Sequence, residues 1–210
     1  NRQPTRESLS SLSGNRWGND LVVWPEAAIP DVYFSSQEFL NVIHQKALAT
    51  NTSLITGILY DDREQQKYFN SLLGLGEANG LYSKQRLVPF GEYVPLESLL
   101  RGVIDFFDLP TSIISIGEKN QPAIKMNQYK IASAICYEIV YPAFVAELAK
   151  NSHVIITVSN DAWFGQSIGP LQHFHMARMR ALETGRYVVR ATNNGVSAII
   201  APNGDITAQS

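Results

Sequence analysis

The chain has 210 residues, of which 45% are hydrophobic and 17% charged, enough for one domain with a sizeable core rather than a disordered chain. Its formal net charge of −2 provides no basic field, so we expect no nucleic-acid partner. The single cysteine excludes an intrachain disulfide and a cysteine-rich zinc site, and we expect no metal.

Residues 1–20 are polar, rich in Ser, Arg and Asn, and lack the pattern of a signal peptide. No apolar run approaches the length of a membrane span. We therefore expect a polar N-terminal segment over residues 1–20 and a single folded domain over residues 21–210. We also expect the chain to be a piece of a longer protein.

Apolar runs of strand-like length alternate along the chain with stretches of helical periodicity. The predicted strands are residues 21–24, 53–60, 67–75, 81–88, 130–135, 154–159, 187–191 and 196–201. The predicted helices are residues 36–50, 141–150 and 171–184. Glycines predict a turn over 74–80, residues 193–195 join the last two strands as a hairpin, and 96–116 is irregular. Strands alternating with helices, plus added antiparallel pairs, predict an α/β layered domain.

Cys136 lies between the strand-like run 131–135 and the helix-like run 141–150. Folds of the α/β class present nucleophiles at such junctions, and a helix N-terminus nearby favours the thiolate. The competing interpretation is a small buried hydrophobic residue, which is the commoner role of a lone cysteine in an arbitrary chain.

Two charged residues beside apolar runs could complete a site around such a nucleophile. A cysteine nucleophile needs a base to take its proton and a donor group where the oxyanion develops. Glu26 follows the first predicted strand, and Lys84 lies in the run 81–88. Taken singly, each is more often a solvated strand end or an edge-strand charge.

Other kinds of site have weaker support in the sequence. None of the four histidines (His44, His153, His173 and His175) has a local signature that pairs it with the cysteine, so a papain-like Cys–His site stays an alternative. The last two are two positions apart on a predicted helix and make a poor metal pair. There is no G-x-S-x-G motif, and the glycines at 74–80 miss the G-x-G-x-x-G spacing, so we expect no dinucleotide cofactor.

Four motifs in a fixed order resemble those of the nitrilase superfamily, and most of all its membrane branch, the apolipoprotein N-acyltransferases. The motifs are Trp24-Pro25-Glu26-Ala27-Ala28-Ile29-Pro30, Lys84-Gln85-Arg86-Leu87-Val88-Pro89-Phe90-Gly91-Glu92-Tyr93-Val94-Pro95, Ile135-Cys136-Tyr137-Glu138 and Ser159-Asn160-Asp161-Ala162-Trp163-Phe164-Gly165. The resemblance runs from about residue 21 to the C-terminus.

The resemblance implies a nitrilase-like αββα sandwich, which we expect to be incomplete at both termini. It implies that Glu26 is the general base, that Lys84 stabilises the tetrahedral intermediate and that Cys136 is the nucleophile. The same comparison implies supporting roles for three further residues, which are Glu92, Tyr137 and Glu138. The chemistry agrees, because a carboxylate beside a lysine keeps both ionised and a thiol between them can lose its proton to the glutamate.

Members of that branch move a fatty acyl chain from a phospholipid, through a cysteine thioester, to the α-amino group of a lipidated N-terminal cysteine on an apolipoprotein. The resemblance therefore implies a phospholipid donor, a lipidated apolipoprotein acceptor and contact with a membrane, without a cofactor. It also places the full-length protein in the bacterial inner membrane, with residues 21–210 as a catalytic domain on the periplasmic side.

Two other functions stay open at this level. A soluble nitrilase-type amidase would use the same three residues on a small amide, and the polar N-terminus and missing membrane spans favour it. A binding domain that keeps only the fold is the third possibility, but the intact Glu26, Lys84 and Cys136 argue against it.

Two aromatic sites are candidates for substrate binding. The segment 160–165 follows a buried strand and ends in glycine, so we expect a loop beside the site that carries Trp163; the alternative is a structural turn with this indole in the core. The apolar stretch 99–110 contains Phe106 and Phe107 and is bracketed by prolines, which suggests an arm that admits an acyl chain. The alternative is that both rings belong to the core.

Overall fold

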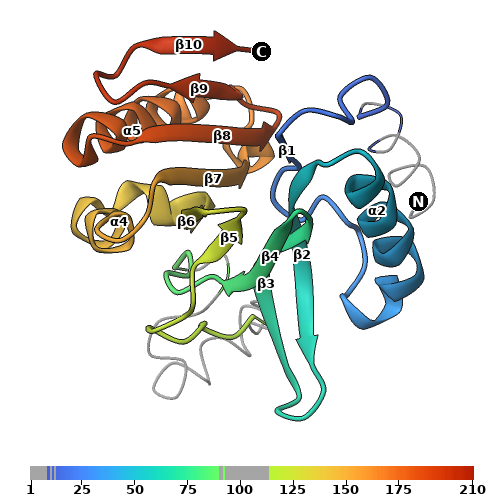
Figure 1. Ribbon diagram of the computed structural model, residues 1–210. Helices are drawn as coiled ribbons and strands as arrows, with labels where there is room; N and C mark the ends of the chain where they lie inside the picture. Colours follow the sequence, from blue (N-terminus) through green and yellow to red (C-terminus); the bar gives the residue numbers. More distant parts are fainter. Residues whose placement is uncertain (1–8, 10, 12, 90–91, 93–113) are drawn as a thin grey trace, which may run out of the picture.

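In the computed structural model, two β-sheet layers lie between two layers of helices (Figure 1). The structure describes residues 9, 11, 13–89, 92 and 114–210. Its strands are β1 (Leu21–Val23), β2 (Ser53–Asp62), β3 (Lys67–Gly76), β4 (Ala78–Ser83), β5 (Ile124–Met126), β6 (Tyr129–Ile135), β7 (Val154–Asn160), β8 (Tyr187–Asn193), β9 (Ala198–Ile200) and β10 (Ile206–Gln209). Its α-helices are α2 (Gln37–Ala49), α4 (Pro142–Ala149) and α5 (Gly169–Thr184).

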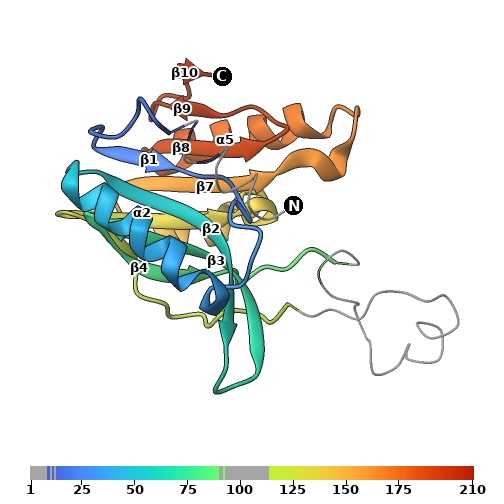
Figure 2. The same cartoon turned by 90° about the vertical axis from the view of Figure 1, so that its right-hand side faces the viewer.

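Hydrogen bonds join the strands in sequence order from β1 to β10. β1 and β2 pair in parallel, as do β6, β7 and β8, whereas the other neighbours are antiparallel. β4 pairs with β3 on one side and β5 on the other, so it joins the two layers. Figure 2 shows the β2–β3 hairpin extending beyond the layers.

Three apolar clusters hold the layers together. The first lies between the sheets and includes Ile55 and Leu72 from one layer and Ile135 and Ile156 from the other. The second packs α2 against the first layer, and the third packs α4 and α5 against the second. The order of layers is therefore helix, sheet, sheet, helix, which confirms the αββα sandwich predicted from the sequence.

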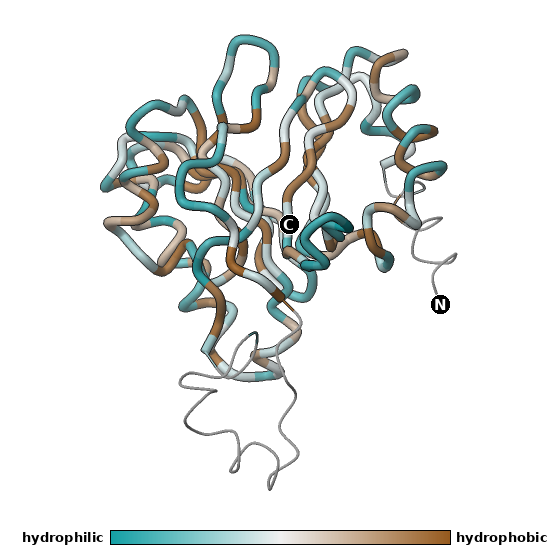
Figure 3. The backbone as a smooth tube through the Cα atoms, turned by 90° about the horizontal axis from the view of Figure 1, so that it is seen from below, coloured by the Kyte–Doolittle hydropathy of each residue, from teal (hydrophilic) through white to brown (hydrophobic). Residues whose placement is uncertain are grey.

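The residue pattern explains why each element has its place. In β6, Ile131 and Ile135 face the opposite sheet while Ala132 and Ala134 face the helices, because a parallel strand is buried on both faces. α2 instead buries one stripe, Leu40, Ile43 and Ala47, and exposes mostly polar residues on its other side, together with Val42 and Leu48. Figure 3 shows this alternation of hydrophobic and hydrophilic residues along α2.

Two local predictions need correction. The turn expected over residues 74–80 is present but much shorter, because β3 runs to Gly76 and β4 starts at Ala78. Gly74 pairs with Gly80 across this ladder, where a Cβ on Gly74 would come within 2.9 Å of the Asn79 nitrogen. The glycines thus permit close pairing of two strands.

The second correction concerns the strand expected over residues 81–88. β4 ends at Ser83, so Lys84 follows this strand and does not lie within it. The predicted hairpin of β8 and β9 is confirmed, whereas the strands β5 and β10 carry no strong apolar alternation and were not expected. None of the helices in the described part of the chain is long and apolar enough to cross a membrane.

Candidate active site

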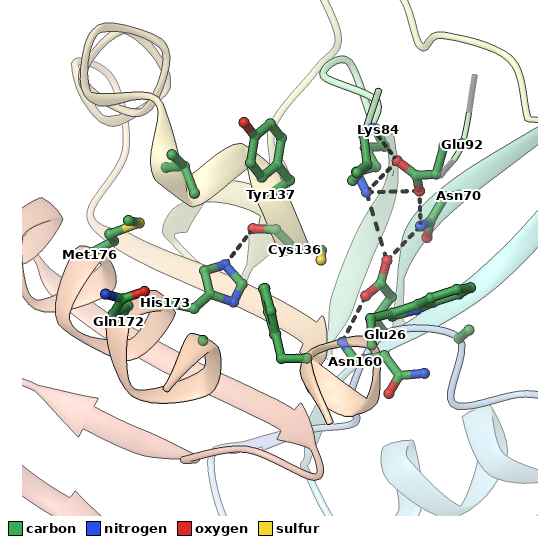
Figure 4. A pocket seen from close by; sticks show the side chains of 16 residues that line it. Glu26, Asn70, Lys84, Glu92, Cys136, Tyr137, Asn160, Gln172, His173 and Met176 are labelled. Atoms are coloured by element: carbon green, nitrogen blue, oxygen red, sulfur yellow. Dashed lines mark hydrogen bonds and ion pairs between the residues drawn. The ribbon is translucent and has the colours of Figure 1, made fainter. Parts of the chain in front are cut away.

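The described residues enclose a cavity of about 620 Å³, within the range of small-molecule sites. The charged and polar side chains that line it include Glu26, Asn70, Lys84, Glu92 and Cys136 (Figure 4). Its apolar wall is formed by Val88, Val140, Trp163, Phe164 and Met176. The cavity thus joins a charged wall to an apolar one.

Cys136 lies at a sharp bend between β6 and the short 3-10 helix η2 (Cys136–Val140). Its φ of 53° is in the left-handed region, which a residue with a side chain rarely adopts. A non-glycine residue persists there only where its surroundings fix it, and such residues cluster at functional sites.

Glu26 follows β1 and is brought into the cavity by a close approach between two segments. A Cβ on Gly57 of β2 would lie 2.5 Å from the Pro25 carbonyl oxygen and 2.8 Å from Glu26 Cα, so only glycine fits there. The Glu26 carboxylate accepts hydrogen bonds from Asn70 Nδ2 at 2.7 Å and from the Asn160 main-chain N–H at 2.8 Å. Both its oxygens are therefore held, and the side chain is buried.

Lys84 is only 1% exposed and directs its ammonium between two carboxylates. Its Nζ lies 2.8 Å from both oxygens of Glu92 and 3.9 Å from Glu26 Oε1. Glu92 Oε2 also accepts a hydrogen bond from the Val88 N–H at 2.7 Å. Asn70 Nδ2, 3.4 Å from Glu92 Oε1, links the two glutamates, so the four side chains form one connected group.

The charges of this group act on the cysteine in opposite directions. Burial raises the pKa of the Cys136 thiol to about 11, and the Glu26 carboxylate adds to the rise, whereas Lys84 and a hydrogen bond from Ser159 lower it. Burial alone would lower the pKa of Lys84, but Glu26, the Cys136 sulfur and Glu92 raise it overall. At neutral pH the lysine is charged and the resting thiol keeps its proton.

This protonated thiol overturns one expectation from the sequence. The N-terminus of the following α-helix was expected to favour the thiolate, but η2 separates Cys136 from α4, which begins only at Pro142. A macrodipole acts within about its first turn, so it does not offset the burial of the sulfur. A thiol with a raised pKa would need a base in order to act as a nucleophile, and the Glu26 carboxylate lines the same cavity.

Glu138 lies two residues after Cys136 and is completely buried. Its carboxylate accepts hydrogen bonds from the Tyr82 hydroxyl and from the main-chain N–H groups of Ile135, Gln85 and Arg86, at 2.6 to 3.0 Å. It thereby ties the segment after Lys84 to the bend at the cysteine. Burial raises the pKa of Glu138 to about 7, although these hydrogen bonds oppose the rise.

The structure places the remaining predicted site residues as follows. Tyr137 lines the cavity beside the cysteine. Trp163 lies in a 3-10 helix, η3 (Asp161–Phe164), rather than in a loop, and is 85% exposed at the cavity, so its interpretation as core filler is wrong. Phe106 and Phe107 lie outside the described residues.

Several residues of the site were not found from the sequence. Asn70 and Asn160 hold the Glu26 carboxylate, and Gly57 makes room for its main chain. His173 was judged to have no partner near the cysteine, yet its Nε2 lies 3.1 Å from the Cys136 carbonyl oxygen. Of these, Asn160 belongs to the fourth motif, and the other three have no local signature; each acts on a residue at least 31 positions away in the chain, as Gly57 does on Glu26. Over the residues that the structure describes, no three potential metal ligands come together.

A family model described as carbon-nitrogen hydrolase matches residues 3–210, so the chain belongs to the carbon-nitrogen hydrolase family. A protein of Pseudomonas aeruginosa named apolipoprotein N-acyltransferase is 53% identical over 193 residues, which cover 90% of this chain and 38% of that protein. A protein of the same name from Shewanella oneidensis is 43% identical over 220 residues, 98% of this chain and 42% of the relative. The chain thus spans about two fifths of the length of these relatives.

Solved structures support the same fold at much lower identity. Nit3 of Saccharomyces cerevisiae, a member of branch 10 of the nitrilase superfamily, matches with a TM-score of 0.73 and 20% identity. The match covers all of this chain and 79% of the yeast protein. At this identity the likeness concerns the nitrilase fold and leaves the substrate open.

Proposed function

We propose that this chain is the catalytic domain of an apolipoprotein N-acyltransferase. The protein would move a fatty acyl chain from a phospholipid to the N-terminal α-amino group of a diacylglyceryl-cysteine apolipoprotein. The observation that carries the proposal is the cavity itself, in which a Glu–Lys–Cys group faces an apolar wall. The name of the relatives at 43 to 53% identity supports the same activity.

In the first step, the Cys136 sulfur attacks the ester carbonyl of the phospholipid while Glu26 takes the thiol proton. The carbonyl oxygen becomes an oxyanion, which the Lys84 ammonium stabilises. The C–O bond of the ester then breaks, and Glu26 returns its proton to the leaving alcohol. A lysophospholipid departs, and the acyl group stays on the cysteine as a thioester.

In the second step, the α-amino group of the apolipoprotein attacks the thioester carbonyl. Glu26 takes a proton from the attacking nitrogen, and Lys84 again stabilises the oxyanion. The C–S bond then breaks to release the amide, and Glu26 passes its proton to the departing sulfur, which restores the thiol and the carboxylate. Glu92 and Asn70 serve this cycle indirectly, because they hold the lysine and the base at 2.7 to 2.8 Å. Water must stay out, since it would hydrolyse the thioester.

The apolar wall supports a long acyl chain as the transferred group. Trp163 and Ile168 are 85% and 65% exposed, and Leu171 is 51% exposed on the first turns of α5. Trp163 lines the cavity, and the other two follow it closely in the chain; exposed apolar side chains that gather in one region are typical of binding sites for apolar partners. We propose that this rim faces the outer surface of a bacterial inner membrane, with residues 21–210 on the periplasmic side, and that Phe106 and Phe107 extend the acyl-chain site.

The test is mass spectrometry of the full-length protein incubated with a phospholipid of one acyl composition. We expect an acyl adduct on the peptide that contains Cys136, and its loss when a synthetic diacylglyceryl-cysteine peptide is added. Cys136→Ala should give neither adduct nor product, and Cys136→Ser should be inactive because a hydroxyl ionises far less readily than a thiol. Hydrolysis of a small amide without any acyl transfer would instead show a nitrilase-type amidase.

A further inference from the structure

A buried polar cluster lies on the helix side of the sheet, directly behind the nucleophile. It consists of Ser159, Asp161, His173 and Arg190, all at most 6% exposed. Asp161 Oδ1 accepts a hydrogen bond from the Ser159 hydroxyl at 2.5 Å, and Asp161 Oδ2 accepts one from Arg190 Nη2 at 2.7 Å. Burying polar groups this deeply costs free energy of folding unless they are paired. The contacts of this cluster with the site therefore indicate its function.

The imidazole of His173 connects this polar cluster to the main chain of the nucleophile. Its Nδ1 lies 3.0 Å from Asp161 Oδ1, and its Nε2 lies 3.1 Å from the carbonyl oxygen of Cys136 (Figure 4). A carbonyl oxygen only accepts hydrogen bonds, so Nε2 carries the hydrogen and donates. In this tautomer Nδ1 is an acceptor, and Arg190 Nη2, which also donates to Asp161 Oδ2, lies 3.2 Å from it as the donor. α5 holds the ring in place, because His173 lies one turn inside it and beside the buried Phe174.

The carbonyl that His173 binds belongs to the residue with the unusual backbone. Cys136 has a φ of 53°, and its left-handed turn directs the side chain from the end of β6 into the cavity. If the φ angle of Cys136 changed to an ordinary negative value, its carbonyl group and its Cα–Cβ bond would turn together. Holding the carbonyl therefore holds the sulfur.

The Asp161 carboxylate also lies next in the chain to Asn160, which holds the side chain of Glu26. Asp161 directly follows Asn160, whose main-chain N–H donates to Glu26 Oε2 at 2.8 Å. The 193–195 turn covers Asp161 closely, since a Cβ on Gly195 would come within 2.3 Å of its Oδ2. Asp161 is thus fixed from several sides and links the position of the cysteine to that of the glutamate.

We propose that His173 is a positioning residue for the nucleophile: its Nε2 holds the Cys136 carbonyl in the left-handed turn, while the Arg190–Asp161 pair holds the ring at Nδ1. The sulfur is thereby kept in the cavity with Glu26 and Lys84. This inference rests on the role of Cys136 in the proposed function, and it adds a residue that does not itself take part in bond making.

Two amide variants of His173 distinguish a role in holding the Cys136 carbonyl from a role in packing alone. In His173→Gln the amide nitrogen can take the place of Nε2 and still reach the Cys136 carbonyl. In His173→Asn the shorter amide takes the place of Nδ1, so it keeps Asp161 and loses the carbonyl. His44→Leu is the matched control, because His44 also binds a main-chain group, the Gly76 N–H at 2.9 Å, but from α2 and outside the cavity lining.

The measurement is the pH profile of iodoacetamide alkylation at Cys136 in the full-length protein, followed by mass spectrometry of its peptide, beside the rate of acyl-adduct formation. For His173→Asn we expect the alkylation midpoint to fall from about 11 toward an ordinary thiol value, because the displaced sulfur regains solvent. Acylation should fall about 10²-fold, as for a misplacement of about 1 Å. His173→Gln and His44→Leu should keep the wild-type midpoint, with acylation within about threefold of wild type.

An unchanged alkylation profile in His173→Asn would overturn the proposal, and so would equal changes in the Asn and Gln variants, which would show a purely structural role. If His173→Asn does not fold, His173→Met fills the same space without a donor and should show the same shift. Alkylation needs no lipid substrate, so this test still decides the positioning role if no acyl adduct forms on the wild-type protein.

Discussion

Gly57 of β2 lies directly against the main chain of Glu26, where a Cβ would come within 2.8 Å of Glu26 Cα and 2.6 Å of the Ala27 nitrogen. Ala27 itself has a φ of 48°, so the chain bends sharply just after the proposed base. Glycine at position 57 is thus what allows this bend to approach the sheet and to place the carboxylate in the cavity.

We predict that Gly57→Ala displaces Glu26 and lowers kcat for acyl transfer by about 10- to 100-fold, because the added methyl meets main-chain atoms that cannot move aside individually. The matched control is Gly185→Ala at the end of α5, where φ is 62° and no atom lies within 4 Å of the added Cβ. It should cost about 1 kcal/mol of stability without changing kcat. Equal kcat values for the two variants, compared at equal folded fraction, would contradict the prediction.

Glu26→Gln should change two rates in opposite directions. Removing the negative charge lowers the pKa of the Cys136 thiol, which the carboxylate helps to raise, so iodoacetamide should alkylate the sulfur faster at pH 8 to 9. Acyl transfer should slow by about 10²-fold or more, because the base is gone. Asn70 can turn its amide to accept from the new side chain, so we expect the fold to persist.

The two rates of Glu26→Gln are measured on one preparation, by peptide mass spectrometry and by product formation. Slower alkylation together with slower transfer would indicate that the substitution disturbs the site as a whole. Lys84→Met provides the comparison of opposite sign, because loss of the ammonium should raise the thiol pKa further and slow alkylation.

Trp163→Ala should change substrate use and leave stability unchanged. The side chain is 85% exposed, so little buried area is lost on truncation, and the melting temperature should stay within about 2 °C of wild type. We expect kcat/KM for a long-chain phospholipid to fall about tenfold, equivalent to about 1.4 kcal/mol of lost apolar contact. A short-chain soluble ester should react nearly as before.

The control for Trp163→Ala is Tyr187→Ala, which removes a half-exposed aromatic ring at the start of β8, outside the cavity lining. It should leave both substrates unaffected. A fall in melting temperature with equal losses on long and short substrates would place the indole in the fold rather than in the substrate site.

Glu138 predicts a pH dependence of stability of definite sign. Burial raises its pKa from an ordinary 4.5 to about 7, so between these values the folded state binds a proton that the unfolded state has lost. The free energy of unfolding should therefore decrease as pH rises from about 4.5 to 7, by about 3 kcal/mol at about 1.4 kcal/mol per pKa unit. Urea unfolding at several pH values measures this slope.

Glu138→Gln should flatten the slope, since the amide does not titrate. Glu64→Gln, an exposed residue of the β2–β3 hairpin, should retain it. A slope of unchanged size in Glu138→Gln would assign the pH dependence to other groups.

The sequence by itself determined the order of all strands and α-helices except β5 and β10, and it singled out Glu26, Lys84 and Cys136. The other strands carry apolar residues at a spacing that depends only on local geometry, and the motifs around these three residues are contiguous in the chain. The layered α/β class and the αββα sandwich followed from these two kinds of local information.

Only the tertiary structure decided how these residues act on one another. Asn70 holds Glu26 across 44 positions, and His173 reaches Cys136 across 37, contacts that leave no local pattern. A helix N-terminus near the cysteine was expected to favour the thiolate, but the thiol pKa is raised mainly by burial, which depends on the packing of both sheets. The sequence likewise left open whether Trp163 is buried or exposed, because aromatic residues occur in both settings. The packing of the neighbouring elements decides this, and it leaves the indole exposed.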